Sequence, residues 1–259
     1  MDFTIQAYQK LLNALQQFGF EFLPYKFFQT KTYAVNQKSI TLRHDVDTHK
    51  KNSLHFAKIQ NAIGITGTYY FRTIPQSYDE KMILEMSAMG HEIGYHYETM
   101  STSNGNVDKA YDEFCRNLEM FRKIVPVSTI CMHGSVMSKF DNRDIWKKYD
   151  YKKLGLLAEP YFDLDFNQTF YLSDTGRRWD GQFSIRDKAM DKNAYNNPDF
   201  LKRSYHSTFD IIKDIERKNF PNQVMMTFHP QRWTDNKMLW YKELLIQNLK
   251  NQVKRLLIT

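Results

Sequence analysis

Short extended segments alternate with amphipathic helical segments through most of this chain, and that alternation constrains its fold more than any other feature. A repeated strand-helix order predicts parallel strands that are joined by crossover helices. Strands are predicted at residues 39–43, 67–71, 92–95, 127–132 and 224–228, and weaker ones at residues 153–157 and 169–172.

The helical segments show apolar residues at spacings of three and four. One such stripe predicts a helical N-terminal lead-in over residues 1–20, and Asn197-Pro198 has the pattern of an N-cap followed by the first helical residue. No repeat, low-complexity tract or Pro/Gly-rich linker divides the 259 residues, so we expect a single domain over residues 1–259. The stripe of the lead-in consists of Phe3, Ala7, Leu11, Ala14 and Phe18.

Polar side chains follow several of the predicted strands directly. Because the carboxyl ends of parallel strands meet at one edge of a sheet or barrel, these side chains are expected to form one site. About seven strands favour an α/β fold with an incomplete or distorted (β/α) barrel over an open doubly wound sheet. The clusters are at residues 44–47, 95–98, 133–134 and 229–233.

Composition narrows the classes of function. The formal charge is +7 and the pI is about 9.1, but basic and acidic residues are interspersed, so we expect no nucleic-acid partner. The first residues lack the pattern of a signal peptide and no apolar run reaches membrane-spanning length, which favours a cytoplasmic protein without a membrane span. Two cysteines, Cys115 and Cys131, exclude a disulfide framework.

The strand-end residues suit the hydrolysis of an amide, which requires a polarised carbonyl, an activated water and a proton for the departing nitrogen. In Asp45-Val46-Asp47, one carboxylate can hold a cation while the other takes a proton from water. His96 and His133 are candidate metal ligands, zinc being the most suitable ion, and His229 is a candidate general acid. A structural role for each single histidine is the alternative.

Other polar and aromatic residues are candidates for contact with a sugar, because sugar rings stack on aromatic rings and their hydroxyls bind polar groups. Packing of a loop with surface ion pairs explains any one of these residues equally well. The candidates are Asp174, Arg178 and Trp179 in one glycine-containing loop, Trp233, and His44 beside the Asp pair.

The ordered set of motifs resembles the polysaccharide deacetylase family, also called the NodB-homology or carbohydrate esterase family 4. Gly90-His91-Glu92-Ile93-Gly94 with His96 is similar to the second motif of that family, and the late His229 matches its order. Leu42-Arg43-His44-Asp45-Val46-Asp47-Thr48 is similar to the Asp-Val-Asp-Thr variant found in a branch that deformylates lipid-linked aminoarabinose. The resemblance implies that Asp45 is the base, Asp47 a metal ligand and His229 the acid.

Two motifs of that family are altered in this chain. The second motif usually supplies a further metal-binding histidine four residues after the first, but here that position is Met100. A thioether is a poor zinc ligand, so either Glu98 or His133 completes the metal site, or metal binding is weak or lost. The third motif, Arg-Pro-Pro-Tyr-Gly in many members, is also absent.

The sequence therefore predicts a metal-dependent hydrolase that removes an N-acyl group, such as N-acetyl, from a sugar or from a nucleotide- or lipid-linked glycan precursor. Two alternatives remain open at this point. One is a hydrolase of another amide, including a cyclic one, on the same fold, and the other is a glycan-binding descendant without catalysis. The sequence leaves the oligomeric state undetermined.

Overall fold

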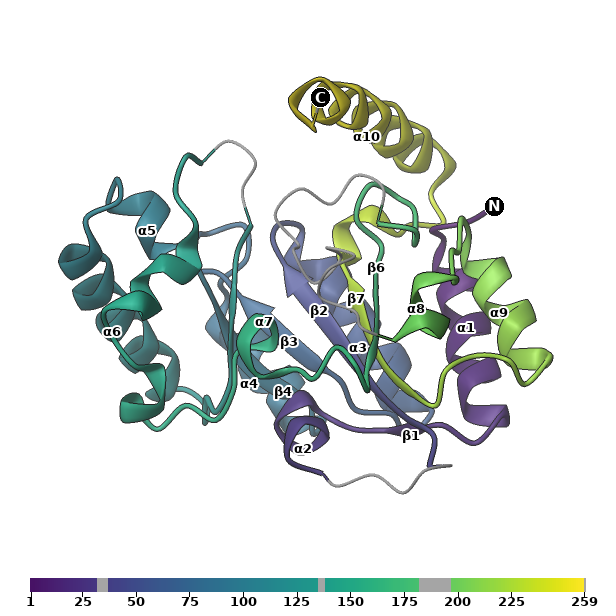
Figure 1. Cartoon of the computed structure of the whole chain (residues 1–259), viewed down its shortest axis with the longest axis horizontal. Helices are drawn as coiled ribbons and strands as arrows, with labels where there is room; N and C mark the ends of the chain where they lie inside the picture. Colours follow the sequence, from purple (N-terminus) through teal and green to yellow (C-terminus); the bar gives the residue numbers. More distant parts are fainter. Residues whose placement is uncertain (32–36, 135–137, 182–196, 259) are drawn as a thin grey trace.

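A seven-stranded parallel sheet organises the chain, and the computed structural model describes residues 1–31, 37–134, 138–181 and 197–258. Six strands follow the order β5-β4-β3-β2-β7-β6, and β1 pairs with β2 beside that path (Figure 1). Every strand pair is parallel. The strands are β1 (Glu21–Phe22), β2 (Ser39–Val46), β3 (Thr68–Phe71), β4 (Glu92–Tyr97), β5 (Ile130–Met132), β6 (Phe170–Ser173) and β7 (Gln223–Phe228).

The sheet curls without closing, because β5 and β6 are the two ends of the strand path and do not pair with each other within the described ranges. This confirms the incomplete (β/α) barrel. The strand expected at residues 153–157 is wrong: Asp150 caps a short 3₁₀ helix, η2 (Tyr151–Leu154), and Gly155 ends it with a φ of 71°. The seventh strand is instead β1, which is only two residues long and so leaves no clear periodic pattern.

Helices cover the sheet (Figure 1). The N-terminal helix α1 begins after Thr4, whose side chain accepts a hydrogen bond from the Ala7 amide, and Asn197 caps α8 with Pro198 in its first turn, as the sequence predicts. The helices are α1 (Ile5–Gln17), α2 (Tyr25–Thr30), α3 (Lys50–Ala62), α4 (Glu80–Ala88), α5 (Thr99–Thr102), α6 (Val107–Arg122), α7 (Pro160–Asp163), α8 (Pro198–Leu201), α9 (Thr208–Glu216) and α10 (Lys237–Ile258), with 3₁₀ helices η1 (Asn142–Lys147) and η5 (Pro230–Arg232).

Strand β2 lies between β3 and β7, and all eight of its residues are buried. Side chains alternate between the two faces of a strand, so Arg43 and Asp45 share one face while His44 points to the other. On that other face the His44 ring stacks on Tyr69, with ring centroids 4.1 Å apart, and bonds to the Tyr8 hydroxyl of α1. The alternation of β2 therefore separates a polar inner face from an aromatic core beneath the helices.

In the described part of the chain, no helix combines the length and the apolar character needed to cross a membrane.

Gly94 in β4 provides a test of the packing beside the polar face. A Cβ at this position would lie 2.3 Å from Cε1 of Tyr70 and 2.9 Å from the backbone oxygen of Thr129, and the backbone oxygen cannot rotate away. We expect Gly94→Ala to lower the free energy of unfolding by roughly 1–3 kcal/mol, measured by urea denaturation. Adding Tyr70→Leu should recover part of the loss, whereas an unchanged urea midpoint for Gly94→Ala would contradict the packing.

Candidate active site

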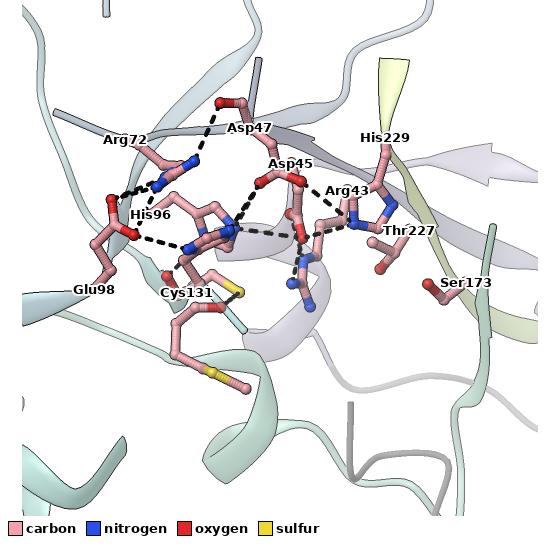
Figure 2. A network of polar contacts seen from close by, with 12 residues as sticks. Arg43, Asp45, Asp47, Arg72, His96, Glu98, Cys131, Ser173, Thr227 and His229 are labelled. Carbon is pink, nitrogen blue, oxygen red and sulfur yellow. Dashed lines mark hydrogen bonds and ion pairs between the residues drawn. The ribbon is translucent and has the colours of Figure 1, made fainter. Parts of the chain in front are cut away.

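The carboxyl ends of four strands bring five of the sequence-predicted residues together. Asp45 lies in β2 and Asp47 just beyond it, His96 lies in β4, and His133 and His229 directly follow β5 and β7. Figure 2 shows the two aspartates at the centre, with His96 and Glu98 on one side and Arg43 and His229 on the other. The imidazole nitrogens lie 3.5–3.9 Å from the aspartate oxygens.

Asp45 is held by a buried ion pair with Arg43, two residues earlier on the same face of β2. Nε of Arg43 donates to Oδ1 at 2.8 Å, and Nη2 donates to Oδ2 at 2.7 Å. Burial alone would raise the pKa of Asp45, but the charge of Arg43, with smaller contributions from His96 and His229, lowers it below its ordinary value. Asp45 is therefore an ionised carboxylate, and each of its oxygens accepts one hydrogen bond from Arg43.

Asp47 differs from Asp45 because one of its oxygens has no hydrogen-bond partner. Its Oδ2 accepts a bond of 3.1 Å from Nε2 of Gln231, while its Oδ1 is buried and unpaired. Nε2 of His96 lies 3.5 Å from that free oxygen, and Nε2 of His133 lies 3.7 Å from it. Burial raises the pKa of Asp47, but the nearby imidazoles outweigh burial and hold the pKa well below its ordinary value.

Both imidazoles that face Asp47 are anchored through their other nitrogen. Nδ1 of His96 lies 2.9 Å from the backbone oxygen of Cys131, and Nδ1 of His133 lies 2.9 Å from Oε2 of Glu98. A carbonyl and a carboxylate only accept hydrogen bonds, so Nδ1 carries the proton in both rings. Each ring thus turns its other nitrogen, Nε2, toward Oδ1 of Asp47, which is the orientation of metal-ligating histidines.

Glu98 has its carboxylate occupied on both sides. Arg72, which directly follows β3, donates to both oxygens of Glu98 at 2.7 Å, and His133 donates to one of them. Burial raises the pKa of Glu98, but its bonds to His133 and Arg72 lower that pKa to about 2. Of the two residues that could stand in for the histidine missing at Met100, the geometry thus favours His133 as the ligand and Glu98 as its positioning partner.

Two sets of residues could hold a cation. Asp45, His96 and Cys131 bring ligand atoms within 4.8 Å of one another, and each oxygen of Asp45 also accepts a hydrogen bond from Arg43. In the second set, Asp47 contributes the unpaired oxygen, and two imidazole nitrogens face it. Two histidines and a carboxylate are donors that suit zinc and related divalent ions, so the donor types of Asp47, His96 and His133 fit a metal, although among the described residues only the first set has all its ligand atoms within 4.8 Å of one another.

His229 approaches the two aspartates from the opposite side. Its Nε2 lies 3.9 Å from an oxygen of Asp45 and 3.9 Å from one of Asp47. Its Nδ1 donates to Oδ1 of Asp174 at 2.5 Å, and Asp174, which follows β6, also accepts bonds from Arg232 and Trp233. Burial raises the pKa of Asp174, but His229 and Arg232 lower it to about 2, so this carboxylate stays ionised and fixes the imidazole.

Most of the residues expected to contact a sugar are buried in the structure. His44, Trp179 and Trp233 are at most 1% exposed, so their rings cannot stack on a ligand. Burial lowers the pKa of His44 to about 3, which makes it a neutral core residue. Asp174 is also fully buried, and its carboxylate binds the His229 ring. Arg178 is bonded to Asp180 and His206.

The sequence alone assigns no role to three polar residues of the site: Arg43, Arg72 and Gln231. Arg72 and Gln231 both stand just after a strand, the same signal that identified the histidines. Arg43 stands two residues before Asp45, and strand periodicity places two such residues on one face. Their positions alone identify all three as candidates for the site. Their positions do not predict which partners they bind.

The comparisons with known proteins are distant. No family model matches the sequence, and no curated protein does. A mutant of BA3943, described as a CE4 family pseudoenzyme with restored enzymatic activity, is similar at 12% identity and a TM-score of 0.43, over 85% of this chain and 65% of the other. This chain therefore spans less than two thirds of the length of BA3943.

Two further solved structures are similar over more of their own length. The polysaccharide deacetylase Bc1974 from Bacillus cereus has 12% identity and a TM-score of 0.43, over 83% of this chain and 89% of its own. Bacillus subtilis PdaA, a family 4 carbohydrate esterase, has 13% identity and a TM-score of 0.40, over 93% of this chain and 83% of its own. These similarities concern the fold of the backbone. The chemistry of the site depends on its own side chains.

The division between ligand and positioning residue predicts different losses of metal affinity. We expect His133→Ala to abolish stoichiometric zinc binding, because it removes a donor atom. Glu98→Gln should weaken binding by only about 10- to 100-fold, because it loosens the ring without removing it. Competition titration with a chromophoric chelator measures both, with His55→Ala on exposed α3 as the control. Stronger loss from Glu98→Gln than from His133→Ala would contradict this division.

Proposed function

We propose that this protein is a metal-dependent amide hydrolase that removes an N-acyl group from a sugar or glycan precursor. The observation that carries the proposal is the unpaired buried oxygen of Asp47, faced by two imidazoles whose other nitrogens are both anchored. Buried polar atoms without partners are rare in proteins, and an oxygen in such a setting suits a cation. Sugar as the substrate class is supported by the motif resemblance.

A divalent ion held by Asp47, His96 and His133 would polarise the amide carbonyl and make an attacking water more acidic. Asp45 would take the proton from that water. Its ion pair with Arg43 keeps the carboxylate ionised despite burial, and also fixes its orientation. Asp45 thus needs no metal bond of its own to remain a base in a buried site.

His229 is placed to deliver a proton on the other side of the reacting amide. As water adds to the carbonyl carbon and the carbon-nitrogen bond breaks, the leaving nitrogen needs a proton to depart as an amine. Nε2 of His229 faces the aspartate pair, while Asp174 holds Nδ1 and stabilises the charged ring. Asp174, Arg232 and Trp233 therefore act through His229 as positioning residues.

Turnover tests the proposal directly. We expect the zinc-loaded protein to release acetate from N-acetylated amino sugars or their oligomers, and Asp45→Asn or His229→Ala to lower kcat/KM by about 10²- to 10⁴-fold. Two exposed positions provide matched controls, Asp112→Asn for the carboxylate and His55→Ala for the imidazole. Acetate release can be followed by a coupled enzymatic assay.

Three outcomes would count against the proposal. Turnover that persists in Asp45→Asn and His229→Ala would remove their assigned roles. Activity that is unchanged after complete chelation would remove the metal. Sugar binding without turnover in the metal-loaded protein would instead favour a glycan-binding protein that has lost catalysis.

A further inference from the structure

The long helix α10 exposes its apolar side to solvent. Residues three or four apart share one face of a helix, and five such residues form a continuous row along α10. We call this row the apolar stripe of α10. It consists of Met238, Tyr241, Leu245, Leu249 and Val253, which are 76%, 56%, 65%, 69% and 57% exposed.

The two residues of α10 whose described side chains are buried against the protein are both polar. Gln247 and Asn251 are 3% and 7% exposed, and Gln247 donates to Asn251. Asn251 in turn donates to the backbone oxygen of Gly176, while Trp240 donates through its indole nitrogen to the backbone oxygen of Asp2. These contacts attach the helix through polar groups, and α10 lies at the edge of the molecule (Figure 1).

The charges on α10 are almost all positive. The helix contains five basic residues and one acidic residue, Glu243. Among the exposed ones, Lys242 lies within the stripe between Tyr241 and Leu245, and Lys237 lies at the start of the helix. The five basic residues are Lys237, Lys242, Lys250, Lys254 and Arg255.

These charges distinguish between the surfaces that could cover the stripe. A second copy packed on the stripe would bury the ammonium group of Lys242 and bring two positive helices together, and both effects are unfavourable. At a lipid surface, a lysine lays its alkyl stem along the apolar region and extends its ammonium to the phosphate layer. An apolar row combined with lysines is the pattern of a helix that lies in the plane of a membrane interface.

We propose that α10 is an interfacial helix that binds this protein to an anionic lipid surface. The stripe enters the boundary between headgroups and acyl chains, and the lysines contact the headgroup phosphates. The proposal requires no membrane-spanning segment and no movement of the helix, because the stripe is already exposed.

The contacts of α10 with the rest of the protein place the helix near the candidate active site. The loop after β6 bonds to α10 through Gly176 and Arg177, and this loop begins with Asp174, which holds His229. The helix and the site therefore share the carboxyl end of the sheet. If the proposed function holds, this placement favours one kind of substrate. An acylated sugar that is carried on a lipid anchor fits it better than a free polymer does.

Vesicle co-sedimentation of the full chain tests the proposal. We expect binding to vesicles of equal parts phosphatidylcholine and phosphatidylglycerol, weaker binding to phosphatidylcholine alone, and weakening by salt. Leu245→Glu with Leu249→Glu should lower the partition coefficient about tenfold or more. Leu84→Glu, at an exposed leucine of α4, is the matched control and should leave binding unchanged.

Two results would overturn the proposal. One is the absence of binding to the anionic vesicles, or equal binding by the double variant. The other is a wild-type chain that is a dimer by light scattering while the double variant is a monomer, because a second copy would then cover the stripe. Turnover of a water-soluble N-acetylated sugar in the same samples reports on the proposed function separately, since α10 takes no part in the chemistry.

Discussion

The buried ion pair between Arg43 and Asp45 is the interaction on which the organisation of the site depends. It links two residues on one face of the central strand β2, and each oxygen of Asp45 accepts one hydrogen bond from Arg43. A carboxylate buried without a partner would take up a proton, so the pair is what keeps Asp45 charged. It also leaves Asp47, two residues on, as the aspartate with a free oxygen for a cation.

The other charged groups of the site follow the same physical requirement, that a buried charge needs a partner. Glu98 is neutralised by Arg72 and holds His133, and Asp174 is neutralised by Arg232 and holds His229. Each of these two carboxylates therefore fixes one imidazole while an arginine offsets its charge. Rings fixed in this way do not need to be ordered when a ligand binds, which favours both metal binding and proton transfer.

Much of this could be predicted from the sequence, for one geometrical reason. The parallel strands end at a common edge, so polar residues just after strands had to meet, and Asp45, Asp47, His96, His133 and His229 do. The partners could not be predicted, because Arg72 reaches Glu98 across neighbouring strands.

The errors have physical causes as well. The pattern of β2 puts His44 on the opposite face from Asp45, but it does not say which face is the core. The tryptophans Trp179 and Trp233 lie in polar loop sequence, which suggested exposure, yet both pack into the aromatic core, where Thr208 and Asp174 accept their indole hydrogens.

The central claim is that Asp45 serves as base while Asp47 serves as ligand. A crystal structure of the zinc-loaded protein, with anomalous data collected at the zinc edge, tests this most directly. We predict one zinc ion bound by Oδ1 of Asp47 and the Nε2 atoms of His96 and His133, with Arg43 still paired to Asp45. An ion bound instead by Asp45 and Cys131, with the Arg43 pair broken, would contradict the account.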